Sequence, residues 1–153
     1  MLKRKFFGVM AVLVVLMLTI GLAACSDGDS SGTGGGGGGG GGSNGNIPPS
    51  YSRGWPSDNT LAKYGLSGLP KWPNAGDSWY GTEKEDGVEV IAIVFEASSD
   101  PTSFYRTWFT SNSFVEYSYG GDIAFVNEKT GAVGTVYYEK SEGIAYVGGG
   151  FAY

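Results

Sequence analysis

The chain has 153 residues, with 10 Lys plus Arg, 15 Asp plus Glu, one Cys and no His. The lack of His excludes Ser-His-Asp and Cys-His catalysis, and a single Cys excludes an internal disulfide and the thiolate clusters that hold zinc or iron–sulfur groups. The net charge of −5 argues against a nucleic-acid partner, because phosphate binding needs a basic surface. Composition therefore predicts no metal and no cofactor.

Residues 1–24 have the features of a secretory signal peptide. Three basic residues at positions 3–5 precede an uncharged apolar stretch over 6–22. Residues 22–25 then read Leu-Ala-Ala-Cys, which resembles the bacterial lipobox, in which the Cys is lipidated and becomes the first mature residue. A retained transmembrane helix is the alternative, because the apolar stretch is almost long enough to cross a bilayer.

The lipobox resemblance implies that Cys25 is acylated and that membrane lipid is the first partner of the mature protein. Several acyl chains on one Cys give essentially permanent attachment to a membrane. The protein is then expected in a bacterial cell envelope. Ser26, rather than Asp, follows the Cys, which favours the outer membrane where a cell has two. Loss of the signal leaves 7 basic and 15 acidic residues, a net charge of −8.

The mature chain is expected to begin with a linker over residues 25–46. Gly fills positions 34–42 without interruption, and Ser, Asn and Asp flank it. Such a segment cannot bury enough apolar surface to fold, so it is predicted to be a flexible tether. The remaining residues, 47–153, are predicted to form one small globular domain.

The first part of the domain is predicted to be a short helix and an irregular loop. Ser57 or Asp58 can cap a helix over residues 59–64, and Gly65 can end it. The loop that follows is rich in Pro. We expect Trp55 and Trp72 to hold this region against the rest of the domain.

A hairpin and a helix come next. Residues 77–83 and 88–97 are predicted strands joined by a turn, and the second is apolar on both faces, as a central strand is. Asp100 and Pro101 then mark the start of a helix. Four aromatic residues at positions 104, 105, 108 and 109 fall on one face of it. Asn112 or Ser113 is expected to end it.

Four apolar runs complete the chain, over residues 114–119, 123–127, 132–138 and 144–147. Glycines 148–150 are expected to break or bulge the last strand before residues 151–153. The predicted fold is α+β, a largely antiparallel sheet of about five strands with one helix packed on a face (β-β-α-β-β-β), preceded by a short helix.

The lipobox, the Gly-rich linker and the Trp-Pro-Ser-Asp-Asn opening at residues 55–59 together resemble small bacterial lipoproteins that carry uncharacterised domains. This resemblance implies membrane anchoring. It implies no activity and no catalytic residues.

Aromatic side chains are the best candidates for a binding surface. The domain holds all four Trp and all ten Tyr, and exposed rings can stack on sugars or hold a peptide. The candidate ligand-binding residues are Trp72, Trp79, Tyr80, Tyr117 and Tyr119. The period of two places Tyr117 and Tyr119 on one face, and Tyr137 and Tyr138 on opposite faces. Core packing is the alternative for each ring.

Without His or a free Cys, the candidates for an enzyme are carboxylates, Ser-Lys pairs and Tyr, and no S-x-x-K motif occurs in the domain. Four acidic residues cluster at the first hairpin turn, Glu83, Glu85, Asp86 and Glu89. Acid–base catalysis needs one of them to be buried with a raised pKa, whereas a charged turn is expected to be solvated. Glu96 is expected to pair with Arg106 in a structural ion pair.

The predicted function is therefore non-catalytic binding or interaction at the cell envelope, with an envelope protein or a glycan as partner. Glycan recognition by exposed aromatics is the alternative, and an envelope enzyme using carboxylates is the third reading. A purely structural surface protein needs no site at all. An edge strand could also accept a strand from a partner. The sequence predicts no oligomeric state.

Overall fold

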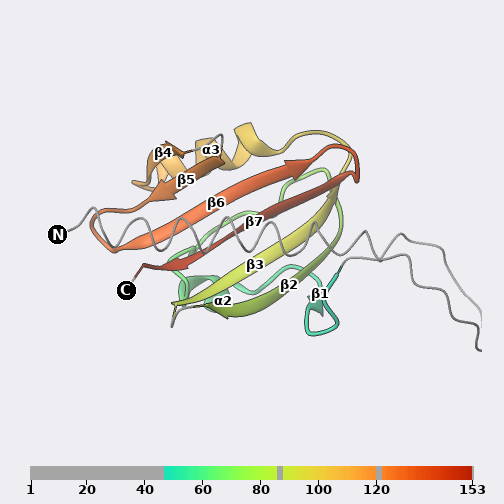
Figure 1. The fold of residues 1–153 in the computed structure, drawn as a ribbon, viewed down its shortest axis with the longest axis horizontal. Coiled ribbons are helices and arrows are strands. Elements are labelled where there is room, and N and C mark those ends of the chain that lie inside the picture. The colour runs from blue at the N-terminus through green and yellow to red at the C-terminus, as the bar shows by residue number, and fades with distance from the viewer. Residues whose placement is uncertain (1–46, 86–87, 120–121, 153) are drawn as a thin grey trace, which may run out of the picture.

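A computed structural model describes residues 47–85, 88–119 and 122–152. Seven antiparallel strands form one sheet in the order β1-β2-β3-β7-β6-β5-β4, and the long strands β2, β3, β7 and β6 lie side by side (Figure 1). The strands are β1 (Ser52–Arg53), β2 (Ala75–Glu85), β3 (Val88–Ala97), β4 (Val115–Tyr119), β5 (Asp122–Val126), β6 (Ala132–Glu139) and β7 (Ile144–Phe151). The helices are α2 (Asp58–Ala62) and α3 (Thr102–Ser111).

The antiparallel sheet with few helices agrees with the prediction, but the count of about five strands is wrong. Four strands follow α3, and β1 adds an edge strand before α2. β1 has only two residues, both exposed, so it has no apolar alternation from which it could be predicted.

Local capping explains where both helices begin. The hydroxyl of Ser57 accepts a hydrogen bond from the Thr60 amide at 3.2 Å, and α2 ends two residues earlier than predicted. The Asp100 carboxylate accepts from the Thr102 amide at 2.8 Å at the start of α3. Asn112 caps the other end. The Ser57 and Asp100 side chains thus accept from amides that lack partners at a helix start, and the Asn112 side-chain amide donates to the Trp108 carbonyl at the end of α3, at 2.8 Å.

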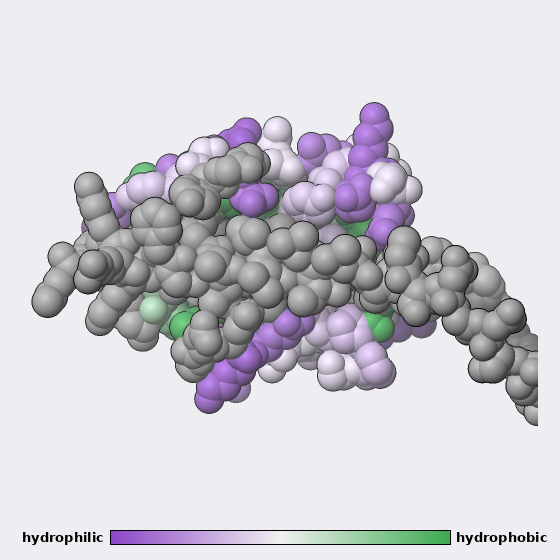
Figure 2. All heavy atoms as spheres, in the orientation of Figure 1, coloured by the Kyte–Doolittle hydropathy of each residue, from purple (hydrophilic) through white to green (hydrophobic). Residues whose placement is uncertain are grey.

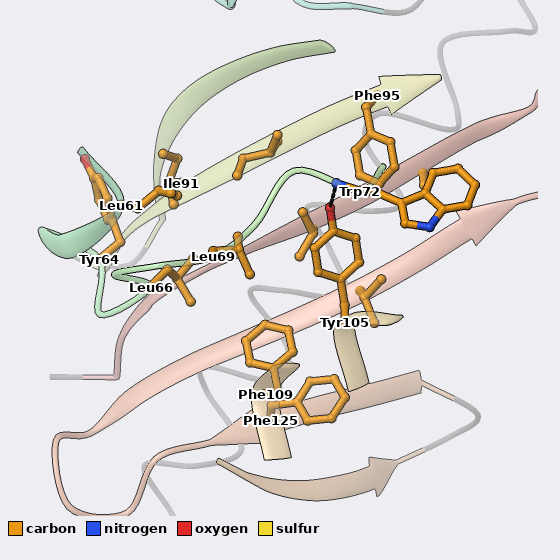
Figure 3. Packing of buried hydrophobic residues seen from close by; sticks show 14 of the residues in the cluster. Leu61, Tyr64, Leu66, Leu69, Trp72, Ile91, Phe95, Tyr105, Phe109 and Phe125 are labelled. Atoms are coloured by element: carbon orange, nitrogen blue, oxygen red, sulfur yellow. Dashed lines mark hydrogen bonds between the residues drawn. The ribbon is translucent and has the colours of Figure 1, made fainter. Parts of the chain in front are cut away.

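The main core lies between one face of the sheet and a layer made by α2, α3 and the loop between α2 and β2 (Figure 3). Trp55 and Trp72 both contact Phe95 of β3. The centroid of the Phe95 ring lies 5.9 Å from that of Trp55 and 6.3 Å from that of Trp72. The expectation that these two indoles hold the irregular region against the sheet is therefore confirmed.

A buried hydrogen bond joins the loop to α3. The Trp72 amide donates to the Tyr105 hydroxyl at 3.1 Å (Figure 3), and the Tyr105 side chain has no exposed surface. Burial raises the pKa of this hydroxyl. The contact satisfies two polar groups that would otherwise be costly to bury.

β7 runs unbroken through its three glycines, so the predicted break or bulge at residues 148–150 is wrong. A Cβ on Gly148 would collide with the backbone carbonyl oxygen of Ile91 in β3. A Cβ on Gly149 would collide with that of Val133 in β6. A Cβ on Gly150 would lie 2.6 Å from the backbone carbonyl oxygen of Glu89 in β3. Glycine here permits close approach of three strands instead of ending one.

The visible margins of the described surface are mainly hydrophilic, with small separate apolar areas (Figure 2). Within residues 47–85, 88–119 and 122–152, no helix is long and apolar enough to cross a membrane.

Candidate functional site

The two faces of the sheet have different partners. Both helices contribute their buried residues to the main core on one face. We call the opposite face the open face. Because paired residues on neighbouring strands point the same way, the register defines rows of side chains that cross this face from strand to strand.

Small side chains form the middle row of the open face. The row consists of Gly81, Ala92, Gly148, Thr135 and Ala124, and it ends at Tyr117 on β4. A row of valines borders it on one side, made by Val90, Val133, Val126 and Val115, with Gly150 between the first two. The side chains in the middle of the face are therefore small and mainly apolar.

Larger rings border the small-residue row on its other side. Trp79 on β2, Val94 on β3, Tyr146 on β7 and Tyr137 on β6 are consecutive partners in this aromatic row. The rings of Tyr137 and Tyr146 are tilted, with centroids 6.2 Å apart. The small-residue row thus lies between a row of valines and a row of larger side chains.

Large apolar side chains that remain accessible gather on this face. Val115 is 46% exposed, and Tyr117 and Tyr137 are each 37% exposed. All three project from the open face by the pairing of β4 and β6. Exposed apolar groups on one face mark an interaction surface better than scattered ones do.

Acidic partners hold the exposed tyrosines in place. Tyr117 donates to Glu128 at 2.8 Å and Tyr137 donates to Glu139 at 2.9 Å. The hydrogen bond to each carboxylate favours the neutral phenol and raises the pKa of both tyrosines. Burial, with a smaller contribution from Glu142, raises the pKa of Tyr146 to about 12. The rings are therefore neutral at physiological pH.

A cleft of about 460 Å³ lies where β3 ends and β7 begins. Its described lining includes Trp79, Ile144 and Ile47, together with the carboxylates of Glu96 and Glu142, and it includes no Lys or Arg. Such a lining favours a neutral or cationic group over an anion. The cleft adjoins the aromatic row through Trp79 and Val94.

The structure divides the predicted ligand-binding residues between the two faces. Trp72 is buried in the main core, and Tyr80 packs against that core from β2. Trp79 and Tyr117 lie on the open face. The backbone of Tyr119 pairs with Asp122 of β5, two residues along β4 from the pair of Tyr117 with Ala124. The side chain of Tyr119 lies outside the described residues. The five residues therefore do not form one site.

Tyr137 and Tyr138 point to opposite faces, as predicted. Tyr137 is exposed on the open face, whereas Tyr138 packs against the core and lies near the Ala97 carbonyl.

Two residues of the open face, Val115 and Tyr146, were not among the candidates predicted from the sequence. Val115 lies two residues before Tyr117, and Tyr146 lies two residues before Gly148. The period of two along a strand therefore places each of them on the same face as a residue of the small-residue row. That period was the signal that could have found them.

The acidic residues of the first hairpin do not converge on a site. Tyr51 donates to Glu83 at 2.7 Å on the open face, and Tyr64 donates to Glu89 at 2.5 Å on the helical face. Register places these two carboxylates on opposite sides of the sheet. Asp86 lies outside the described residues, as does the side chain of Glu85. The described carboxylates of this hairpin, Glu83 and Glu89, therefore do not form a pair.

The predicted Glu96–Arg106 ion pair is wrong. Arg106 pairs with Glu116 of β4 at 2.9 Å, while Glu96 accepts from the Asp77 amide at 3.2 Å. Arg106 belongs to the helix on the core side, and Glu96 points to the other side of β3. The sheet itself separates the two charges.

Among the described residues, no group of three or more His, Cys, Asp or Glu could hold a metal ion. Comparison of the chain with protein-family models, with curated proteins and with solved structures found no match.

Proposed function

We propose that the mature protein is a lipid-anchored, non-catalytic binding module of a bacterial cell envelope, and that it binds through the open face. The observation that carries the proposal is that Val115, Tyr117 and Tyr137 are all accessible on this one face. Tyrosine side chains contribute strongly to protein interfaces when they are covered, and Val115 adds apolar area beside them.

The anchor and the linker fit this role. Acylation of Cys25 would attach the protein to a membrane, on the outer membrane where the cell has two, since Ser26 follows the Cys. A Gly-rich linker of residues 26–46 has an expected r.m.s. span of about 25 Å. A domain on such a linker can turn its binding face toward a partner in the envelope.

Glycan recognition is the second candidate, because sugars bind to aromatic rings that have polar acceptors nearby. Tyr137 and Tyr146 form a neighbouring pair of rings, and the carboxylate of Glu139 lies at the Tyr137 hydroxyl. Trp79 adds a third ring beside a cleft with two further carboxylates. Stacking on the rings and hydrogen bonds to the carboxylates would recognise sugar hydroxyls.

Site-specific photo-cross-linking in intact cells tests both candidates. Benzoylphenylalanine replaces Tyr117 or Tyr137 on the open face, and Thr107 on the exposed side of α3 is the control. We expect discrete adducts from the two open-face positions and none from position 107. A muramidase-sensitive adduct indicates a glycan, and a resistant adduct of protein size indicates a protein partner.

Two results would overturn the proposal. The first is the absence of an adduct at both open-face positions in a chain that is folded and anchored. The second is an equal adduct at position 107, which would mean that contact does not depend on this face.

A further inference from the structure

A row of acidic and apolar side chains borders the aromatic row at the end of the open face where the cleft lies. Glu96 of β3 pairs with Ile144 of β7, and Ile144 pairs in turn with Glu139 of β6. Each of these residues lies two positions along its strand from a member of the aromatic row, so all three point to the open face. Two carboxylates therefore flank one apolar side chain, on strands about 10 Å apart.

This end of the open face carries an excess of negative charge. Glu142, in the turn between β6 and β7, adds a third carboxylate and lines the cleft together with Glu96. Both ion pairs in the described part of the chain use other acids. Lys140, the basic residue of the same turn, is exposed and does not belong to the described lining of the cleft. A cation is therefore the complement of this end of the face.

The fold holds the carboxylate of Glu96 in place at the cleft. It accepts a hydrogen bond from the Asp77 amide at 3.2 Å. A Cβ on Gly76 would lie 2.5 Å from the Glu96 Oε2 atom and 2.9 Å from its Cβ, so glycine at this position leaves the space that the Glu96 side chain occupies. Since both neighbours belong to the β2 segment, they fix the carboxylate before any ligand arrives.

The rest of the lining suits an aliphatic chain. Ile47, Val94 and Ile144 supply apolar side chains, and Trp79 supplies an aromatic ring. The volume of about 460 Å³ is in the range of pockets that hold small organic groups. A Trp ring attracts a cation that lies against its face. Apolar surface, a ring and carboxylates in one cleft match a compact positive charge at the end of an aliphatic stem.

We propose that the cleft binds a protonated amine on an aliphatic stem, with the ammonium group at the carboxylates of Glu96 and Glu142 and the stem against Trp79 and Ile144. The inference rests on the proposed binding role of the open face, and it names the chemical group that this end of the face accepts. A lysine side chain of a protein partner and a free alkylamine both present this group.

Titration of the full-length protein, purified from cells in detergent, tests this binding through the indole N–H signals in NMR spectra. The signal of Trp79 is assigned by its loss in Trp79→Phe. The probes are a blocked Ala-Lys-Ala tripeptide and cadaverine, and the neutral control is the same tripeptide with norleucine in place of Lys. Glu96→Gln and Glu142→Gln each remove one charge from the cleft. The matched variant is Glu128→Gln, which removes one exposed charge at the other end of β6.

We expect the Trp79 signal to shift saturably with an amine probe and not with the norleucine peptide. Each cleft variant should weaken binding by about threefold to fivefold, as for loss of one partly exposed ion pair, and Glu128→Gln should leave it unchanged. The other indole signals report whether each variant is folded. Tighter binding of the tripeptide than of cadaverine assigns the amine to a protein partner, and the reverse assigns it to a free amine.

Three results would overturn the inference: no saturable shift with either amine, an equal shift with the norleucine peptide, or an equal loss of affinity in Glu128→Gln. The photo-cross-links at Tyr117 and Tyr137 require contact with the open face but no positive charge on the partner. A neutral partner would give those cross-links while this titration fails, so the two proposals fail separately.

Discussion

Gly149→Ala is expected to destabilise the domain by about 3 kcal/mol or more, at the upper end of the range for overpacked sites. The new Cβ would collide with the Val133 carbonyl oxygen and lie 3.0 Å from the Gly134 Cα, both backbone atoms of β6. Backbone in the middle of a sheet cannot move aside as a flexible side chain can. Urea unfolding followed by Trp fluorescence measures the loss as a lower midpoint.

Gly68→Ala is the matched control for this substitution. Gly68 has a φ of +76°, and nothing lies within 4 Å of a Cβ placed on it. Its replacement therefore costs only the left-handed backbone conformation, about 1–2 kcal/mol. Equal losses for the two variants would show that β7 does not need the close approach that we ascribe to its glycines.

Phe109→Ala is expected to cost about 3–5 kcal/mol, the range for removal of a buried Phe. The Phe109 ring has no exposed surface and stacks on Phe125 with centroids 4.4 Å apart. It also lies against Gly134, which has no side chain to fill the space that the ring would leave. The same urea titration measures the change in the free energy of unfolding.

Phe104→Ala, on the same helix, is the comparison for Phe109→Ala. Phe104 is only partly buried and packs at the edge of the core against Tyr105. A smaller loss is expected because part of the ring is already in water. A loss at Phe109 no greater than at Phe104 would contradict the role of Phe109 as the centre of contact between α3 and the sheet.

Much of the fold could be predicted because the signals were local. Caps at Ser57 and Asp100 mark the helix starts, and apolar runs mark β3 and the later strands. The glycines of β7 could not be read correctly in the same way. Their meaning depends on Ile91 and Val133, which are far away in sequence and adjacent only in the sheet.

The candidate site was predicted only in part, for a similar reason. A period of two shows which residues share a face, as it does for Tyr117 and Tyr119, but it does not show which face the helices cover. Trp72 lies in a Pro-rich loop and Trp79 in a strand, and neither local pattern shows which ring is buried, yet the first is in the core and the second lines the cleft. The Glu96–Arg106 pairing failed because strand β3 lies between the two side chains.

Lipid attachment of this domain through Cys25 is tested by intact mass and detergent-phase partitioning of the native protein beside Cys25→Ala. We expect a mature chain that begins at Cys25, carries a lipid-sized mass increment and partitions into detergent, with the increment lost in the variant. A native protein of unmodified mass would contradict lipid attachment, whether it pellets with membranes through a retained apolar segment or remains in the aqueous phase.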